Sequence, residues 1–307
     1  MAMDENQDHK KKSKNLHKPP VVLVTFRLIF KYLGALFPKL IGRWAYKLWF
    51  SVHRSSTIPR REQKWLETAS NIKAIDLEIN EFGVGTLAVM TYTWENTKIK
   101  DAPLVMLLHG WTGRGSQMGA FVEPLLESGF RVIAFDNHGH DKTPGKATHL
   151  FLQSAVQRAL AEKIGPIQAI ITHSFGGMVT AYSLKHGMQT QKIVCISPPS
   201  RFDFLLERFS KSLHLPKSIQ TYMTNRFIKE YGDNLEERVS STSTSQQLGH
   251  IPALIIHDET DEDVPISESE LMHQAWPNSK MIRTKDLGHR RILYNAQVVE
   301  NTVNFIK

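Results

Sequence analysis

The stretch "AIITHSFGGM", residues 169–178, joins a buried apolar run to a helix through a single serine. Ser174 follows the apolar segment 167–173, and two glycines open the segment after it. A serine on so sharp a strand-to-helix turn is lifted out of the sheet, and its hydroxyl lies close to a helix N-terminus. The pattern G-x-S-x-G is met except at its first position, where Thr172 stands. Because S-x-G-G alone also occurs in ordinary turns, the rest of the chain must decide whether Ser174 is a nucleophile.

Segments that predict strands and helices alternate from about residue 73 onward. A hairpin is predicted first, with strands at 73–80 and 86–94. Further strands are predicted at 103–109, 131–136, 167–173, 192–197, 251–257 and 279–286, and helices at 116–130, 150–164, 176–188, 271–276 and 290–306. Repeated β-α units require a mostly parallel, twisted sheet with helices on both faces. In such α/β sheets the reactive groups gather at the carboxyl ends of the strands.

Residues 201–250 interrupt this alternation. They have helical spacing and no strand-like run, and they lie between two strands that should be neighbours in the sheet. We therefore predict a small helical cap at 201–250 and a core domain made of 55–200 and 251–307. Within the cap, the serine- and threonine-rich stretch 240–247 is predicted to be a loop.

Two further reactive groups follow predicted strands. Asp258, Asp261 and Asp263 all come after the strand 251–257, and His289 comes after the last strand. A carboxylate beside a histidine fixes the tautomer of the imidazole and stabilises the imidazolium that forms in the transition state. Serine, acid and histidine in this chain order are typical of one large hydrolase fold. The stretch "DETDED" lacks the central glycine and terminal glutamate of a calcium-binding EF-hand loop, which disfavours a metal site.

The segment "LLHGWTG", residues 107–113, supplies a fourth element at a strand end. There the turn at Gly110 directs backbone amides toward the predicted site. The N–H groups of Trp111 and of Phe175, which follows the serine, could together hold an oxyanion. Loss of one such donor typically costs about 10²–10³ in rate, so this loop matters as much as the side chains.

On these motifs, residues 103–307 resemble the α/β-hydrolase superfamily of serine hydrolases. The resemblance rests on "HGWTG", "DNHGHDKT", "THSFGG", "HDETDEDVP" and "GHRRIL". It implies an α/β-hydrolase fold, with Ser174, Asp261 and His289 as the catalytic residues and a substrate pocket beneath the cap. Asp261 takes the place of the family's acid and Asp258 that of a family glycine, so Asp258 and Asp263 stay as alternative acids.

The expected activity is hydrolysis of a carboxylic ester or thioester through an acyl-enzyme, with a small-molecule acyl substrate and neither cofactor nor metal. The pair His138 and His140 could bind zinc, but no third ligand stands at a fitting spacing. Two alternatives remain open. One is a protein that binds a ligand or partner on a hydrolase scaffold without turnover. The other is a hydrolase that acts on lipid at a membrane surface.

The positive charge of the chain lies in its first 54 residues. Residues 1–20 contribute +2 and residues 21–54 contribute +6, which together account for the net charge of +8. The balanced remainder gives no support for a nucleic-acid groove. Cys195 is the only cysteine and no secretory cleavage site follows the apolar run, so a cytoplasmic location is expected.

Residues 1–20 are predicted to be a disordered basic tail, and residues 21–54 an amphipathic helical extension divided at Pro38. A membrane span is disfavoured because Arg27 and Lys31 lie within the first apolar piece. Two interpretations of 21–54 remain: a helical pair docked on the core domain, or a peripheral anchor on anionic lipid.

Overall fold

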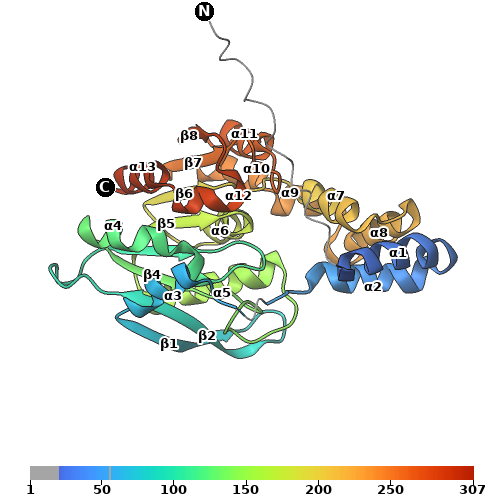
Figure 1. Cartoon of the computed structure of the whole chain (residues 1–307), viewed down its shortest axis with the longest axis horizontal. Coiled ribbons are helices and arrows are strands. Elements are labelled where there is room, and N and C mark those ends of the chain that lie inside the picture. The colour runs from blue at the N-terminus through green and yellow to red at the C-terminus, as the bar shows by residue number, and fades with distance from the viewer. Residues whose placement is uncertain (1–20, 55–56) are drawn as a thin grey trace, which may run out of the picture.

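Residues 21–54 and 57–307 are described by the computed structural model, and within them eight strands form one sheet (Figure 1). The predicted disorder of 1–20 lies outside these described residues. The strands are β1 (Asn71–Ile79), β2 (Gly85–Trp94), β3 (Leu104–Leu108), β4 (Arg131–Phe135), β5 (Ile167–His173), β6 (Lys192–Ile196), β7 (Ala253–Asp258) and β8 (Ser279–Thr284). Their order in the sheet is β1-β2-β4-β3-β5-β6-β7-β8.

The direction of the strands is that of the predicted fold. β1 pairs antiparallel with β2, and β2 antiparallel with β4, while every pair from β4 to β8 is parallel. β6 and β7 are neighbours although the predicted cap separates them in the sequence. The expected α/β-hydrolase fold, with its mostly parallel sheet and N-terminal hairpin, is confirmed.

The inner strands β3 to β7 are buried on both faces, as their continuous apolar runs predict. Along β3, Leu104, Met106 and Leu108 face one apolar layer, and Val105 and Leu107 face the other. The first layer is covered by α5 (Leu150–Ile164), α6 (Phe175–Lys185) and α11 (Ile266–Ala275). The second is covered by η1 (Gly115–Phe121), α4 (Val122–Glu127) and α13 (Ala296–Ile306). Because all parallel strands end at one edge, the loops that follow β3, β5, β7 and β8 lie near one another.

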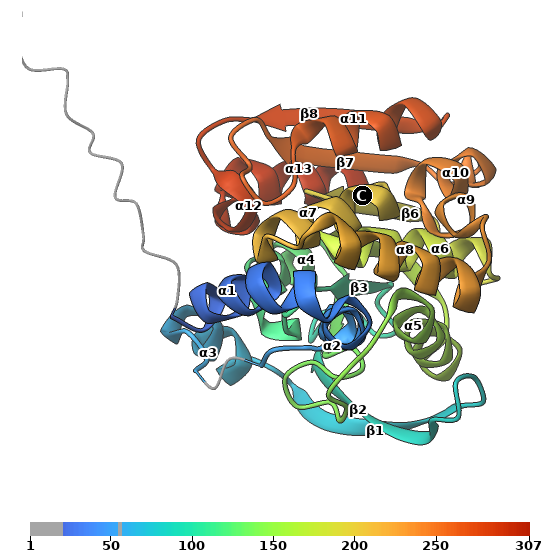
Figure 2. The ribbon, with the colours of Figure 1, turned by 90° about the vertical axis from the view of Figure 1, so that its right-hand side faces the viewer.

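A third apolar cluster joins the cap to the N-terminal helices. The cap helices, as we call the helices between β6 and β7, are α7 (Phe202–Leu213), α8 (Lys217–Tyr231), α9 (Leu235–Val239) and α10 (Ser241–Ser245). α1 (Val21–Leu36) and α2 (Pro38–Phe50) pack against them, and the ring centroids of Tyr46 and Phe227 are 4.9 Å apart. Figure 2 shows α1, α2, α7 and α8 together in front of the core. α2 begins at Pro38, where a proline costs no helical hydrogen bond.

Several predicted helices differ in their bounds. The segment 116–130 is a 3₁₀ turn followed by the short α4, with Pro124 in the first turn, where no N–H is needed. The segment 290–306 is divided into α12 (Gly288–Arg291), η3 (Ile292–Tyr294) and α13, because the Asn295 side chain accepts from the N–H of Val298 and caps a new helix. α11 begins at Ile266 rather than at 271, and α3 (Arg60–Glu67) was not predicted.

The prediction of a loop at 240–247 is wrong, because Ser241–Ser245 form the helix α10 and η2 (Gln246–Leu248) follows it. Small buried side chains explain the difference. Ser241, Thr244 and Ser245 are fully buried, and α10 lies against α6 and α11. The Thr244 hydroxyl donates to the carbonyl of Ser240, so its hydrogen bond is made within the helix and does not compete with the helical conformation.

Candidate active site

Ser174 occupies the turn between β5 and α6 that the sequence predicts. Its backbone has φ 53° and ψ −128°, a conformation that residues other than glycine rarely adopt. The N–H of Ser174 donates to the carbonyl of Ile196 at 2.8 Å, and the carbonyl of Ser174 accepts from the N–H of Gly177 at 2.9 Å. These two bonds hold the serine in its unusual conformation from both sides.

Two glycines allow the neighbouring backbones to approach this turn. A Cβ on Gly176 would lie 2.7 Å from the carbonyl oxygen of His109, and a Cβ on Gly110 would lie 2.8 Å from the Cβ of Ser174. Both separations are shorter than side-chain carbons tolerate. The loop after β3, which carries Trp111, can therefore lie directly against Ser174.

Thr172 replaces the first glycine of the serine motif without disturbing the turn. Its side chain is fully buried, and its hydroxyl donates to the carbonyl of Val194 at 3.2 Å. An added Cβ on Gly177 would lie at an ordinary contact distance of 3.5 Å from the Thr172 hydroxyl but only 2.9 Å from Cβ of Pro198, so Gly177 makes room for Pro198 and not for Thr172. Thr172 is thus accommodated within the sheet, where its hydroxyl has a partner.

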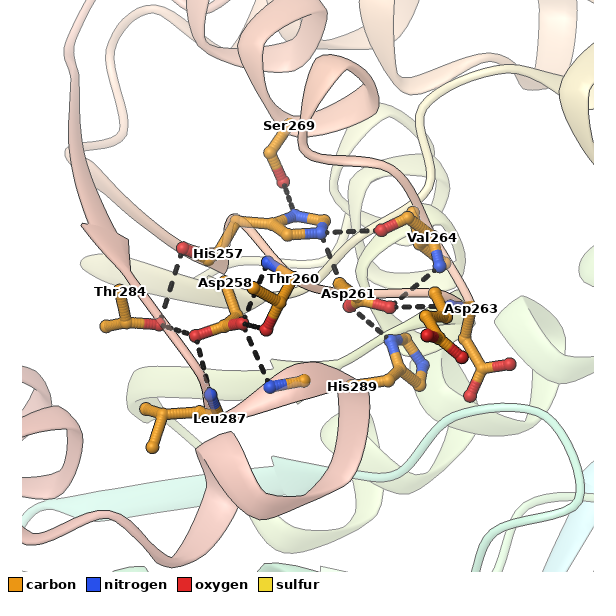
Figure 3. Close-up of polar contacts among 12 residues, drawn as sticks. His257, Asp258, Thr260, Asp261, Asp263, Val264, Ser269, Thr284, Leu287 and His289 are labelled. Atoms are coloured by element: carbon orange, nitrogen blue, oxygen red, sulfur yellow. Dashed lines mark hydrogen bonds and ion pairs between the residues drawn. The ribbon is translucent and has the colours of Figure 1, made fainter. Parts of the chain in front are cut away.

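His289 and Asp261 form the central polar contact of the site (Figure 3). The Nδ1 atom of His289 lies 2.7 Å from Oδ2 of Asp261, while Oδ1 of Asp261 accepts from the N–H groups of Asp263 and Val264 at 2.8 and 2.9 Å. Burial alone would raise the pKa of Asp261, but the hydrogen bonds and the nearby imidazoles outweigh it and hold that pKa well below its usual range. The carboxylate is therefore ionised and fixes Nδ1–H as the donor, which leaves Nε2 of His289 as the proton acceptor.

The three competing aspartates have three different environments (Figure 3). Asp258 accepts hydrogen bonds from the N–H groups of Leu287 and Gly288 at 3.0 and 2.9 Å, so it braces the loop that carries His289. Asp263 instead forms an ion pair with Arg208 of the cap at 2.5 Å. Only Asp261 contacts the imidazole of His289 among these three.

Two histidines without an assigned role support this arrangement. His257, fully buried at the end of β7, donates from Nε2 to the carbonyl of Val264 at 2.9 Å, and the same atom lies 3.3 Å from Oδ2 of Asp261. Its Nδ1 accepts from the hydroxyl of Ser269 at 2.5 Å. His173, next to the serine, donates from Nε2 to the backbone carbonyl of His289 at 2.8 Å. Burial, followed by the positive field of His289, lowers the pKa of His173 to about 3, so it is a neutral donor. The only sequence signal for either residue is its place at a strand end.

The predicted oxyanion residues are neighbours in space. The rings of Trp111 and Phe175 meet edge to face with centroids 5.4 Å apart, and Phe175 is the first residue of α6, so its N–H has no partner within the helix. His109 stiffens the loop: Nδ1 donates to the carbonyl of Gly110 at 2.7 Å, and Nε2 accepts from the N–H of Asn137 at 3.1 Å. Burial lowers the pKa of His109 well below its ordinary value, which keeps the ring neutral.

Ser174 and His289 line one cavity of about 1080 Å³. Within the described chain their side chains are not hydrogen-bonded to each other, but His173 links the serine turn to the backbone of His289. The wall of the cavity is largely aromatic and aliphatic, with contributions from α2, the cap and the core: Trp49, Phe50, Trp111, Phe175, Phe202, Leu205, Phe209 and Phe227. Its size suits a ligand with a sizeable apolar group.

The part of the chain that the structure describes contains no group of three or more His, Cys, Asp and Glu side chains that could hold a metal ion. His138 and His140 lie in a loop after β4. Nδ1 of His140 bonds to the carbonyl of His138 at 3.0 Å, and its ring lies 4.8 Å from that of His109. Burial lowers the pKa of both rings, to about 4 for His140.

Comparison with known proteins identifies the family. The model of the alpha/beta hydrolase family matches residues 105–301, so the chain belongs to this family, and this membership supports hydrolase activity. Two solved structures share the fold at low sequence identity. An esterase of Pyrococcus furiosus has a TM-score of 0.61 and 20% identity, with 83% of this chain and 97% of that chain covered. Est1E of Butyrivibrio proteoclasticus, with ferulic acid bound, has a TM-score of 0.57 and 18% identity, with 76% of this chain and 96% of that chain covered.

A curated protein matches over a shorter segment. Proline iminopeptidase PfmaB of Pestalotiopsis fici is 30% identical over 102 residues, which is 31% of this chain and 36% of that protein. The matched segment thus spans about a third of the length of this relative.

Thr172→Gly tests how the serine turn tolerates the missing glycine. We expect the variant to lose about 2 kcal/mol of stability, because a glycine in a strand interior is entropically unfavourable and a buried methyl and hydroxyl are lost. The reaction of Ser174 with a fluorophosphonate should persist, because the backbone bonds that hold Ser174 are made with Ile196 and Gly177 and not with the side chain of Thr172. Urea unfolding and labelling measure the two effects. A fully stable variant that no longer labels would show that Thr172 has a direct role at the site.

Asp258→Asn tests the brace of the His289 loop. Although burial opposes ionisation, hydrogen bonds from Thr260, Gly288, Thr284 and Leu287 lower the pKa of Asp258 to about 2. The pKa of Asp258 is lower in the folded protein than its unfolded value of about 3.9, so the ionised carboxylate stabilises the fold at every pH above that value. This stabilisation is lost as the pH falls toward 2, because the carboxylate is then protonated. We expect the free energy of unfolding of Asp258→Asn to be lower than that of wild type by on the order of 2 kcal/mol at pH 7.

Urea unfolding over a range of pH values measures this effect. The difference in the free energy of unfolding between wild type and Asp258→Asn should become smaller as the pH falls from about 4 to 2. A difference in the free energy of unfolding that stays constant over that range would contradict the role of the ionised carboxylate. Asp263→Asn is the matched control, because the ion pair of Asp263 with Arg208 is exposed to solvent.

Proposed function

We propose that this protein is a serine hydrolase that cleaves a carboxylic ester or thioester through an acyl-enzyme, with Ser174, Asp261 and His289 as its catalytic residues. The observation that carries the proposal is the bond of 2.7 Å between Nδ1 of His289 and the ionised carboxylate of Asp261, beside the cavity that Ser174 lines. Such a histidine keeps a free lone pair on Nε2, as a base for Ser174 would require.

The first half of the reaction acylates the serine. Nε2 of His289 takes the proton of the Ser174 hydroxyl while Oγ forms a bond to the carbonyl carbon of the substrate. The carbonyl π electrons move to oxygen, and the N–H groups of Trp111 and Phe175 hold the oxyanion. When the carbonyl re-forms, the bond to the alcohol or thiol breaks, and Nε2–H protonates the leaving group. Asp261 stabilises the imidazolium throughout.

The second half releases the acid. Nε2 of His289 deprotonates a water molecule, which attacks the acyl carbon and forms a second tetrahedral intermediate in the same oxyanion site. Collapse of this intermediate breaks the bond to Ser174, and the serine oxygen recovers its proton from His289. No cofactor is required by these steps.

The lining of the cavity supports an acyl substrate with a sizeable apolar group. Aromatic and aliphatic side chains of the cap, among them Phe202, Leu205 and Phe209, form much of its wall. The similarity to a proline iminopeptidase covers only part of that protein, and the same steps would cleave an amide. Rates on matched p-nitrophenyl esters and p-nitroanilides separate the two bond types, and we expect the ester to be the better substrate.

We also propose that the enzyme works in the cytoplasm. Cys195, the only cysteine of the sequence, is fully buried in β6, and burial raises the pKa of its thiol to about 12. The chain therefore needs no oxidising environment for its fold.

Fluorophosphonate labelling tests the nucleophile. We expect wild type to be labelled and Ser174→Ala not to be, while His289→Ala should label at least about 10³-fold more slowly. Ser212→Ala is the matched control, because Ser212 also lines the cavity but bonds to the carbonyl of Phe209. Undiminished labelling of Ser174→Ala would refute the assignment. Complete absence of labelling and of ester cleavage by wild type would favour a ligand-binding protein without turnover.

Asp261→Asn and Asp263→Asn test the acid. Replacing the triad acid by its amide leaves the geometry but favours the wrong tautomer of the histidine, so kcat of Asp261→Asn should fall by about 10⁴-fold. Asp263→Asn should stay within a factor of about three, because Asp263 contacts Arg208 rather than His289. Hydrolysis of a p-nitrophenyl ester gives both rates, and the reverse order would assign the acid to Asp263.

A further inference from the structure

The exposed apolar side chains of this protein are concentrated in one place. In the described part of the chain thirteen large apolar side chains are strongly exposed, and nine of them lie between residues 21 and 40. These nine, which we call the α1–α2 surface, are Val21, Val22, Val24, Leu28, Tyr32, Leu33, Leu36, Phe37 and Leu40. Contiguous exposure on this scale is typical of a surface that contacts another apolar phase.

α1 is apolar on two sides, and only one of them is covered. Phe30 is fully buried, and Phe26 and Ile29 pack with it in the cluster shared by α2 and the cap helices. The exposed side includes Leu28 and Leu36, so the apolar character of the helix continues beyond what the packing on the cap requires. A helix that is apolar all round is normally buried in a core or in a membrane.

The charged side chains that α1 and α2 themselves carry are all positive. Lys31, Lys39, Arg43 and Lys47 are exposed, and no aspartate or glutamate occurs between residues 9 and 61. Basic side chains next to an apolar face are attracted to anionic lipid headgroups, at about 1 kcal/mol for each charge near the surface. A second copy of the same surface would instead bring like charges together, which disfavours self-association.

We propose that the α1–α2 surface docks on an anionic lipid bilayer, with its apolar side chains at the depth of the headgroup–acyl boundary and its lysines and Arg43 among the headgroups. The surface lies on the membrane and does not cross it: α1 has 16 residues, and no helix of the described chain is long and apolar enough to span a bilayer. Figures 1 and 2 show α1 and α2 on the outside of the cap, away from the sheet.

Docking would bring the cavity close to the lipid. α2 has 13 residues, which is about 20 Å of helix, and its last turn contributes Trp49 and Phe50 to the wall of the cavity. The docking itself does not depend on the proposed catalysis, because lipid binding can be measured with Ser174→Ala protein.

Vesicle co-sedimentation of the full-length chain tests the docking. The probes are vesicles of phosphatidylcholine with and without phosphatidylserine. We expect binding that requires phosphatidylserine and weakens with added salt. Equal binding to both vesicle types, or binding to neither, would overturn the proposal.

Matched pairs of substitutions test the surface. Leu28→Glu with Leu36→Glu should lower the affinity for phosphatidylserine vesicles about tenfold or more. The control is Ile72→Glu with Ile99→Glu, because these side chains are also exposed: Ile99 is 46% exposed and Leu28 is 50% exposed. Ile72 lies in β1 and Ile99 follows β2, so both are outside the α1–α2 surface. Equal affinities of the two double variants would contradict the assignment.

A second pair, Lys31→Gln with Lys39→Gln, keeps the apolar side chains and removes only charge, so it serves even if the glutamate variant fails to fold. It should also bind phosphatidylserine vesicles more weakly, by about tenfold. Unchanged affinity would contradict the role of the exposed cations. Sedimentation velocity without lipid is the remaining measurement: a monomer is expected, and a dimer dispersed by Leu28→Glu with Leu36→Glu would show that the surface pairs two copies instead.

Discussion

The close approach of three backbone segments around Ser174 is the constraint on which the site depends. The loop after β3 and the first turn of α6 can reach the serine only because Gly110 and Gly176 carry no side chain. With the serine held at positive φ by its bonds to neighbouring backbone, its position is set by the sheet and not by its own preference. The histidine and the acid then need only short loops to reach the same edge, since β7 and β8 end there.

The sequence predicted the sheet well because its inner strands, β3 to β7, are buried on both faces and stand out as continuous apolar runs. It also indicated the serine and the histidine by their places after strands. It could not decide among Asp258, Asp261 and Asp263, because their environments depend on groups distant in the chain, such as Arg208 in the cap. The same limit explains α10, where serines and threonines that favour turns locally are held in a helix by burial against α6 and α11.

Residues 21–54 show why amphipathicity alone leaves a question open. The apolar spacing of α1 and α2 fits both packing on a domain and binding to lipid, and each use requires only one apolar face. In the structure the first apolar face packs against the cap helices through residues such as Phe30 and Ile41. The second face is visible only once the first has been assigned, which is information that the sequence pattern does not contain.

The contact between Arg208 and Asp263 has a consequence for how the cap is held on the core. It connects α7 of the cap to the loop that also carries Asp261, two residues from the contact of Asp261 with His289. The two side chains are 41% and 46% exposed, and an ion pair in such surroundings stabilises by roughly 0–1 kcal/mol. Thermal motion is enough to break a contact this weak. Breaking this pair alone would not free the cap, because Arg201 just before α7 also pairs with the fully buried carboxylate of Glu268 on α11. The attachment of the cap to the core thus depends on that buried carboxylate and on apolar packing more than on the exposed pair.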